Sequence, residues 1–283
     1  MSGRCENCGS EAPRTVKFGR PDLTACSACG GWSWHGEVAS PPELLYDERY
    51  FTEGEYASYV TAGASHARNF GRKLELLERC GIAPSGARML ELGCATGEFM
   101  RVARRKGLER AIGIEPSAYC REIARSDGLD VREPSEPGLS AAIAELNPNL
   151  VVAWDVWEHL PAPATTLEKT LGMASDDAYV AITTVDASSA VARFRRDRWR
   201  QFHPPTHLHF PTRRSFELLF GRLGMRVRLH RAFGYYRPLR EYLRVLGIRP
   251  RATARWADLP IYFNLFDTQL IIAQRSSHAG GQG

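Results

Sequence analysis

A short segment rich in small residues is the part of this sequence best suited to bind a ligand. Glu91-Leu-Gly-Cys-Ala-Thr-Gly97 lies between an apolar stretch and an amphipathic one, so we expect a turn between a strand and a helix. Gly93 allows the backbone to turn sharply, while Ala95 and Gly97 are small enough to let a ligand approach the main chain. Glu91 is a carboxylate near the end of a buried strand, where it requires a polar partner.

A second carboxylate, Glu115, lies 18 residues beyond Gly97, at the end of the next apolar stretch. In open α/β sheets ligands bind beyond the carboxyl ends of the strands, and a carboxylate there accepts both hydroxyls of a ribose. The glycine spacing is Gly-x-x-x-Gly and lacks the glycine that dinucleotide enzymes place beside a pyrophosphate. S-adenosylmethionine (SAM) has a ribose and an adenine but no phosphate. The alternative is a generic strand-to-helix turn, but Glu115 at this distance favours a SAM site.

Four of the seven cysteines lie in the first 29 residues, in two closely spaced pairs. Cys5-x-x-Cys8 and Cys26-x-x-Cys29 have the spacing of a four-cysteine zinc ribbon. Gly9 and Gly30 follow the second cysteine of each pair and ease the turn that presents the thiolates. A redox dithiol is the alternative, but two pairs at this spacing favour structural Zn²⁺. Metal binding would supply most of the folding free energy of so small a segment.

The elements that must position these residues form a regular alternation. From about residue 86, short apolar strands alternate with amphipathic helices, which is typical of a parallel sheet covered by helices on both faces. The predicted fold class is therefore α/β, with a doubly wound, mostly parallel, seven-stranded sheet and a small N-terminal zinc ribbon. We expect strands at 88–92, 111–115, 129–131, 149–154, 178–184, 225–231 and 267–273, and helices at 97–107, 117–127, 138–146, 161–173 and 212–223.

The chain of 283 residues is long enough for one large α/β domain and an accessory module. We expect a zinc ribbon over 1–40, a helical lead-in and cap over 41–85, and a SAM-binding domain over 86–283. The segment 186–211 has no clear period, and long irregular segments in compact domains are usually lids or binding loops. We therefore expect it to be a substrate-binding insertion.

Composition and charge limit the partners. The chain has no run of eighteen uncharged apolar residues and no apolar core near its N-terminus, so we expect a cytoplasmic protein with no membrane partner. The net charge of +5 includes a local run of arginines, namely Arg193, Arg195, Arg196, Arg198 and Arg200. Such a run is either a solvated face or a patch for an anionic ligand, and the sequence leaves this and the oligomeric state open.

Three motifs together resemble the successive signatures of class I SAM-dependent methyltransferases: Glu91–Gly97, Gly113-Ile-Glu-Pro-Ser117 and Trp154-Asp-Val-Trp-Glu-His-Leu160. The resemblance covers about residues 46–275 and departs from many members at Ala95, where they have glycine. It implies that Glu91, Gly93, Ala95 and Gly97 line the methionine end of SAM, that Glu115 holds the ribose, and that Asp155 lies near the methionine moiety. The N-terminal cysteine module before such a domain also resembles the deoxysugar C-methyltransferases, in which it is structural.

The acceptor cleft is expected between the lead-in helix, the loop after the fourth strand and the 186–211 insertion. Methyl transfer needs a base when the acceptor must lose a proton, and histidine titrates in the suitable range. His207 is the candidate general base, because its position resembles that of the catalytic histidine in sugar C-methyltransferases; the alternative is a packing role. The expected acceptor is a small molecule, such as a sugar or another secondary metabolite, methylated on oxygen or carbon. Contacts with the arginine run would make it anionic.

Two further hypotheses stay open. Asp155, Glu158 and His159 share one face if the turn there is helical, and with His207 they could hold Mg²⁺ or Mn²⁺. This set is similar to the metal site of small-RNA terminal 2′-O-methyltransferases, which makes His159 a second candidate catalytic residue and RNA an alternative acceptor. The same motif also occurs in family members that need no metal, where the histidine packs under the cofactor. The other hypothesis is a non-catalytic nucleic-acid-binding protein that uses its zinc ribbon.

Overall fold

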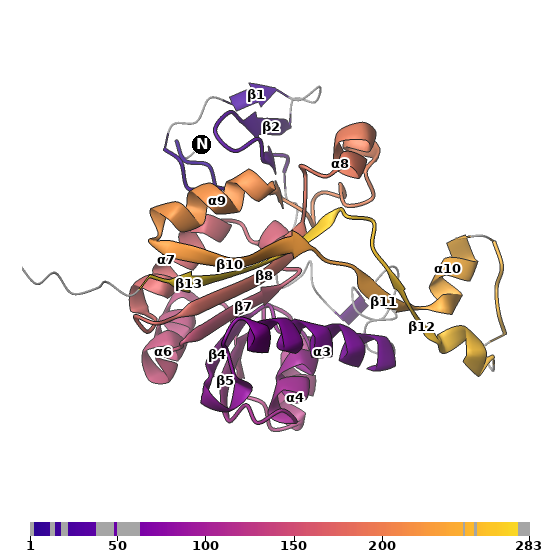
Figure 1. The fold of residues 1–283 in the computed structure, drawn as a ribbon, viewed down its shortest axis with the longest axis horizontal. Coiled ribbons are helices and arrows are strands. Elements are labelled where there is room, and N and C mark those ends of the chain that lie inside the picture. Colours follow the sequence, from indigo (N-terminus) through magenta and orange to yellow (C-terminus); the bar gives the residue numbers. More distant parts are fainter. Residues whose placement is uncertain are drawn as a thin grey trace, which may run out of the picture.

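A computed structural model of the chain describes residues 3–11, 15–17, 22–37, 48–49, 63–245, 247–251 and 254–276. Its centre is a seven-stranded sheet in the order β10-β13-β8-β7-β4-β5-β6 (Figure 1). The strands are β4 (Arg88–Leu92), β5 (Arg110–Ile114), β6 (Val131–Arg132), β7 (Leu150–Trp154), β8 (Tyr179–Val185), β10 (Met225–Ala232) and β13 (Thr268–Arg275). The first five in chain order run parallel, and β13 is antiparallel to both β8 and β10. The predicted fold class is confirmed.

Helices cover both faces of this sheet, because alternate residues of each strand point to opposite sides. In β4, Met89 packs into one apolar core with α3 and α4, and Leu90 packs into the other with α6, α7 and α9. The helices are α3 (Gly63–Arg79), α4 (Glu98–Arg104), α5 (Ala118–Ser126), α6 (Glu136–Leu146), α7 (Pro163–Met173) and α9 (Arg213–Arg222). In the described residues no helix is both long enough and apolar enough to cross a bilayer.

The order of the strands creates the ligand-binding position. From β4 the chain adds β5 and β6 on one side and then crosses to β7 and β8 on the other. The carboxyl ends of β4 and β7 therefore border a topological switch point, where open α/β sheets bind ligands. The turn that begins at Gly93, Glu115 and Asp155 all directly follow strands that end at this edge.

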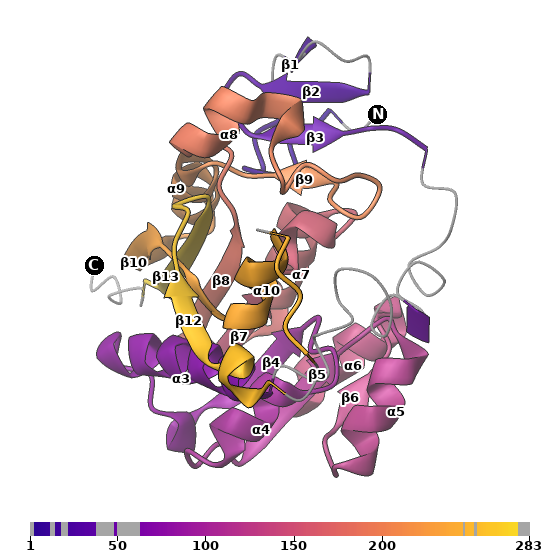
Figure 2. The same ribbon diagram turned by 90° about the vertical axis from the view of Figure 1, so that its right-hand side faces the viewer.

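The N-terminal module is joined to the 186–211 insertion by strand pairing. Its strands β1 (Thr15–Lys17), β2 (Leu23–Cys26) and β3 (Trp32–Trp34) form one sheet with β9 (His209–Phe210) of the insertion (Figure 2). Trp32 also packs edge-on against Trp199 of the insertion, with ring centroids 6.2 Å apart. The insertion contains a short helix, α8 (Ala190–Arg195), before β9. The cysteine module thus supports the segment that carries His207.

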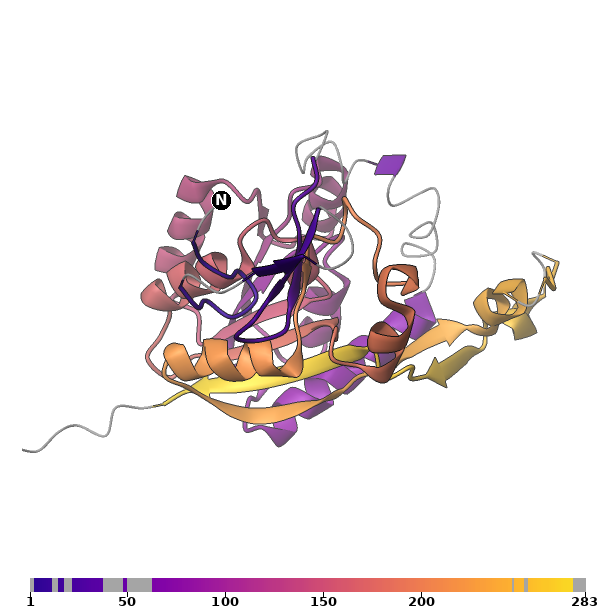
Figure 3. The same cartoon turned by 90° about the horizontal axis from the view of Figure 1, so that it is seen from above.

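One projecting structure lies in a part of the chain that has no periodic hydrophobic pattern. Residues 235–266, which we call the arm, contain β11 (Tyr235–Pro238), α10 (Leu239–Val245), a 3₁₀ turn (Arg255–Asp258) and β12 (Pro260–Phe263). β11 and β12 form a two-stranded antiparallel sheet that extends away from the body (Figures 1 and 3). The helical lead-in expected before residue 85 is represented by α3, and most of 41–62 lies outside the described residues.

Candidate active site

A cavity of about 680 Å³ opens at the carboxyl ends of β4, β5 and β7. This volume lies within the usual range of small-molecule sites. Its walls come from the turn after β4, from α3, from the segment after β7 and from residues 200–207 of the insertion. These last three are the segments in which the sequence analysis placed the acceptor cleft. The arm adds a further wall that was not foreseen.

The turn after β4 has the strained backbone that its small residues suggested. Gly93, Ala95 and Gly97 have positive φ values of 66°, 46° and 81°. A Cβ on Gly93 would lie 2.4 Å from Cγ2 of Val156, so only glycine fits there. Ala95 pays about 1–2 kcal/mol for a left-handed conformation, and its backbone N–H donates to Oε2 of Glu115 at 2.8 Å. The carboxylate therefore helps to hold the turn.

Glu115 is the buried anion of the cofactor side of the cavity. Its Oε1 accepts a second backbone N–H, from Ser117 at 2.9 Å. Burial raises the pKa of Glu115, and the two backbone N–H donors oppose that rise. Each carboxylate oxygen can accept a further hydrogen bond, so the side chain keeps capacity for a ligand.

Four of the six predicted cofactor residues line the cavity, namely Gly93, Ala95, Glu115 and Asp155. Glu91 and Gly97 do not. Glu91 is buried behind the turn, which raises its pKa well above the usual range, and its Oε2 has no hydrogen-bond partner in the described part of the chain. Gly97 leads into α4, where a Cβ would lie 2.2 Å from Cδ1 of Leu129. We therefore assign packing to Gly97 and a buried carboxyl group behind the site to Glu91.

Asp155 is held by two residues that the sequence analysis missed. Its Oδ2 lies 3.4 Å from Nζ of Lys73, and its Oδ1 accepts the hydroxyl hydrogen of Tyr235. Lys73 is only 1% exposed, and its ammonium lies 4.7 Å from the ring centre of Trp154. Burial lowers the pKa of Lys73, and the charge of Asp155 opposes this. A lysine on the buried face of α3, between Phe70 and Leu77, was the signal available in the sequence.

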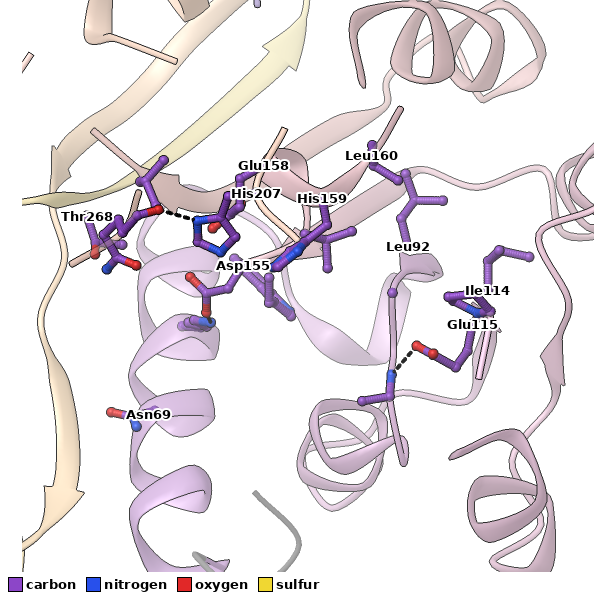
Figure 4. Close-up of a pocket in the computed structure, with 18 of the residues that line it drawn as sticks. Asn69, Leu92, Ile114, Glu115, Asp155, Glu158, His159, Leu160, His207 and Thr268 are labelled. Carbon is purple, nitrogen blue, oxygen red and sulfur yellow. Dashed lines mark hydrogen bonds and ion pairs between the residues drawn. The ribbon is translucent and has the colours of Figure 1, made fainter. Parts of the chain in front are cut away.

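His207, His159 and Glu158 meet on the other side of the cavity (Figure 4). The Nδ1–H of His207 donates to the carbonyl oxygen of Gln201 at 2.7 Å, and the Nδ1–H of His159 donates to that of Thr206 at 2.8 Å. A carbonyl oxygen only accepts, so in each neutral ring Nε2 carries the lone pair. Glu158, His159 and His207 each offer one ligand atom, and these atoms lie within 4.8 Å of one another.

Burial sets the charge of this cluster. It lowers the pKa of His159 to about 4 and that of His207 well below its usual value. It raises the pKa of Glu158 to about 8, with the nearby charge of Asp155 adding to the rise. The two imidazoles are therefore neutral at pH 7. Glu158 also accepts the hydroxyl hydrogen of Thr184 at 2.7 Å, which fixes the orientation of its carboxyl group.

The predicted four-residue metal set is corrected in one member. The turn after β7 is a 3₁₀ turn that begins only at Trp157, and Asp155 precedes it with a φ of 58°. Asp155 therefore does not share a helical face with Glu158 and His159, and the group of candidate metal ligands excludes it. His209 of the same insertion contacts Ser33 and the carbonyl of Pro161 and does not line the cavity.

The raised pKa of Glu158 predicts how the free energy of unfolding depends on pH. We expect the free energy of unfolding of Glu158→Gln, minus that of wild type, to increase as the pH rises from 4.5 to 8. Over this interval the unfolded wild-type chain releases the Glu158 proton while the folded protein keeps it, so wild type loses stability as pH rises. The loss is about 1.4 kcal/mol per pH unit, up to about 5 kcal/mol in total, and the glutamine side chain does not titrate.

Urea unfolding in a chelator at pH 4.5 and pH 9 measures this difference. Glu75→Gln, at an exposed position of α3, is the matched control and should show no such change. A Glu158→Gln effect of equal size at both pH values would show that the carboxyl group is not protonated in the folded protein near neutral pH.

The four cysteines form a second, separate cluster with two identical turns. Gly9 and Gly30 both have a φ of 70°, as their positions predicted, and their N–H groups donate to the carbonyls of Cys5 and Cys26 at 2.7 Å. The sulfurs of Cys5 and Cys29 are 3.9 Å apart, and those of Cys8 and Cys26 are 4.0 Å apart. Tetrahedral Zn²⁺ with Zn–S bonds of about 2.3 Å requires sulfur separations of about 3.8 Å. The arrangement is therefore compatible with a zinc site.

The family of the chain follows from its match to a family model. The family model described as a methyltransferase domain matches residues 65–230, which is more than half of the chain. The chain belongs to the methyltransferase domain family. Among curated proteins none matches the sequence significantly. The match begins in α3 and ends in β10, so it contains the turn after β4 and the histidine cluster.

Solved structures show the same fold for this methyltransferase. Magnesium protoporphyrin IX methyltransferase (ChlM) from Synechocystis PCC 6803, with bound SAH, aligns with a TM-score of 0.50 at 13% identity over 81% of this chain and 92% of that chain. The YcgJ protein from Bacillus subtilis aligns with a TM-score of 0.52 at 11% identity over 74% of this chain and 98% of that chain. At such identities the likeness concerns the fold alone.

The methyltransferase is SAM-dependent, and the turn after β4 suits that cofactor. Bound SAM supplies a methyl group on a positively charged sulfur. The cavity presents the Glu115 carboxylate, and the carboxyl group of Glu91 is buried behind the Gly93 turn. This end of the cavity thus offers a carboxylate that accepts hydrogen bonds from hydroxyls and attracts a cationic ligand.

Proposed function

We propose that this methyltransferase transfers a methyl group from SAM to a small-molecule acceptor, a sugar or another secondary metabolite, with His207 as general base. One observation carries the proposal. A single cavity joins the Glu115 carboxylate to a buried imidazole, that of His207, whose Nε2 is unprotonated. A volume of about 680 Å³ suits a cofactor and a small acceptor.

The residues divide between holding the cofactor and handling the proton. Gly93, Ala95 and Glu115 hold the cofactor, and Asp155, fixed by Lys73 and Tyr235, lies between the two ends of the cavity. The acceptor oxygen or carbon forms a bond to the methyl carbon, and the carbon–sulfur bond breaks with its electron pair on sulfur. The acceptor proton passes to Nε2 of His207.

The low pKa of His207 is compatible with this role on an oxygen acceptor. A hydroxyl oxygen becomes strongly acidic as it bonds to the methyl carbon, so a weak base accepts its proton late in the reaction. Because the imidazole stays neutral at pH 7, it does not repel a cationic sulfonium. The hydrogen bond to the carbonyl of Gln201 keeps Nε2 as the accepting atom.

A second candidate function is favoured by the grouping of Glu158, His159 and His207. A carboxylate and two imidazoles, each with its Nδ1–H donated to a backbone carbonyl, have the ligand chemistry of a divalent cation site. Mg²⁺ or Mn²⁺ held there would act as a Lewis acid on an acceptor hydroxyl, as in the RNA 2′-O-methyltransferase hypothesis. Titration of Mn²⁺ into wild type and Glu158→Gln measures binding by these residues.

Activity tests separate these candidates. The full chain is incubated with methyl-labelled SAM and a panel of sugars, nucleotide-linked sugars, phenols and short RNAs, in a chelator and with Mn²⁺. We expect label in a small molecule and none in RNA. Label in the 3′-terminal ribose of RNA, formed only with Mn²⁺, would replace the small-molecule proposal by the second candidate.

We also propose that Cys5, Cys8, Cys26 and Cys29 bind one structural Zn²⁺. The N–H of Gly31 donates to the sulfur of Cys29, and the hydrogen bond with Cys29, followed by that with Cys8 and by burial, raises the pKa of Cys5. Four thiolates cannot be held this close without a cation. The sheet shared by β3 and β9 makes this module a support for the insertion that carries His207.

Loss of this zinc is expected to destabilise the protein. Cys26→Ser/Cys29→Ser should contain no zinc and should have a Tm lower by about 5 °C or more, since each kcal/mol shifts the Tm of a domain of 150–250 residues by roughly 2–4 °C. Elemental analysis and thermal unfolding measure both effects. Cys80→Ser, at a half-buried cysteine outside the module, is the control. Wild type without zinc, and with a Tm insensitive to chelators, would disprove the assignment.

A further inference from the structure

The arm exposes an unusual amount of apolar surface. Five of its large apolar side chains are between 42% and 57% exposed, namely Ile248, Trp256, Leu259, Ile261 and Phe263. Three of them are aliphatic and two are aromatic, and they come from the loop after α10, from the 3₁₀ turn and the residue that follows it, and from β12. Soluble monomeric proteins rarely expose large apolar patches, and the patches that they do expose commonly mark interaction sites.

The same arm is strongly basic. It contains six arginines and only two acids, Glu241 and Asp258. Both acids are neutralised within the arm, by Arg237 and Arg240. The other four arginines are exposed and have no ion-pair partner among the residues that the structure describes; these are Arg244, Arg249, Arg251 and Arg255. The apolar side chains are thus accompanied by unbalanced positive charge.

A second element with the same character also borders the cavity. Residues 190–200, which we call the α8 rim, expose Phe194 to 89% and carry Arg193, Arg195, Arg196 and Arg198 at their surface. Arg200 of this rim and Arg237 of the arm both line the cavity. The arm and α8 lie on one side of the molecule, which faces the viewer in Figure 2 and lies to the right in Figure 3.

We propose that the arm and the α8 rim bind the surface of an anionic lipid bilayer, with the mouth of the cavity turned toward it. Proteins that bind the surface of a membrane share two features. Their apolar side chains enter the headgroup region, and their cations contact anionic headgroups. This partner departs from the expectation of no membrane partner, which rested on the absence of a spanning segment or a signal sequence.

Other occupants of this surface fit the side chains less well. In a symmetric dimer through the arm, the unpaired arginines of two copies would face each other, and like charges at an interface are unfavourable. RNA would pair with the arginines and stack on Trp256 and Phe263. The aliphatic Ile248, Leu259 and Ile261 offer no stacking surface, whereas the interior edge of a bilayer accepts them.

Co-sedimentation of the full chain with vesicles tests the proposal. Vesicles of equal parts phosphatidylglycerol and phosphatidylcholine are compared with vesicles of phosphatidylcholine alone. We expect wild type to bind the anionic vesicles at least tenfold more tightly. Both Trp256→Ser/Phe263→Ser and Arg249→Gln/Arg251→Gln should weaken that binding at least tenfold. These side chains are exposed, so unfolding curves should match wild type.

Matched variants elsewhere on the surface serve as controls. Met173→Ser/Val227→Ser removes exposed apolar groups from α7 and β10, and Arg105→Gln/Lys106→Gln removes two exposed charges after α4. Both should bind vesicles as wild type does. The proposal is overturned if wild type ignores anionic vesicles, if the control pairs weaken binding as much as the arm pairs, or if a short RNA displaces the protein from vesicles. A wild-type dimer that the arm variants convert to monomers would also overturn it.

Discussion

Glu115→Gln is expected to weaken the binding of S-adenosylhomocysteine by about 100-fold or more, because two hydrogen bonds to a charged group contribute about 1.5 kcal/mol or more each. The two oxygens of Glu115 accept the backbone N–H groups of Ala95 and Ser117. A glutamine has one oxygen, so its amide NH₂ would face one of these donors. The substitution therefore removes the charge and also disturbs the left-handed Ala95 turn.

Isothermal titration with S-adenosylhomocysteine measures this loss without any acceptor. Glu122→Gln, an exposed carboxylate on α5, is the control and should bind as wild type does. Unfolding curves for both variants show whether the folded protein is retained. Affinity within threefold of wild type in a folded Glu115→Gln protein would contradict the assignment of Glu115 to the ribose.

The turn after β4 could be predicted because its signals are local. Positive φ at Gly93 and Gly97 and a carboxylate at the end of the next strand follow from residue type and from the strand–helix alternation. The Cys-x-x-Cys-Gly turns were predictable for the same reason, since each is closed by a bond from the glycine N–H to the first cysteine of its pair. Short-range geometry of this kind needs no knowledge of tertiary packing.

The remainder of the site depends on contacts between distant segments. Lys73 and Tyr235 meet at Asp155 from α3 and from the arm, separated by more than 150 residues. The pairing of β3 with β9 likewise joins residues 32–33 to 209–210. A single sequence gives no signal for such pairings. The arm was missed because its two strands have four residues each, and neither alternates buried and exposed side chains, so the hydrophobic periodicity of a strand is absent.

The separation of Asp155 from Glu158 has a physical consequence for the site. A helical turn would have placed three titratable groups on one face, but the left-handed backbone at Asp155 directs it to Lys73 and Tyr235. One acid is thereby paired with the ammonium of Lys73 on the cofactor side of the cavity. The other is buried beside two neutral imidazoles, and its pKa rises to about 8. The cavity thus has one part with a paired acid and lysine and one neutral part that can accept a proton.

His207→Phe is expected to lower the rate of methyl transfer by about 100- to 10,000-fold, the usual contribution of a general base. The affinity for S-adenosylhomocysteine should change less than threefold, because Glu115 and the Gly93 turn hold the cofactor. Phenylalanine fills the same space beside Phe210 and His159 but offers no lone pair. Single-turnover rates with methyl-labelled SAM and the acceptor found in the panel measure the loss.

His209→Phe is the matched control, because His209 is buried two residues away in the same insertion and faces Ser33 rather than the cavity. If both substitutions reduce the rate equally, the insertion acts through its packing and His207 is not the base. If only His207→Phe is slow and Mn²⁺ binding is lost with it, the same imidazole serves as a metal ligand. A slow His207→Phe protein that is insensitive to chelators and keeps its cofactor affinity is the result that general-base catalysis requires.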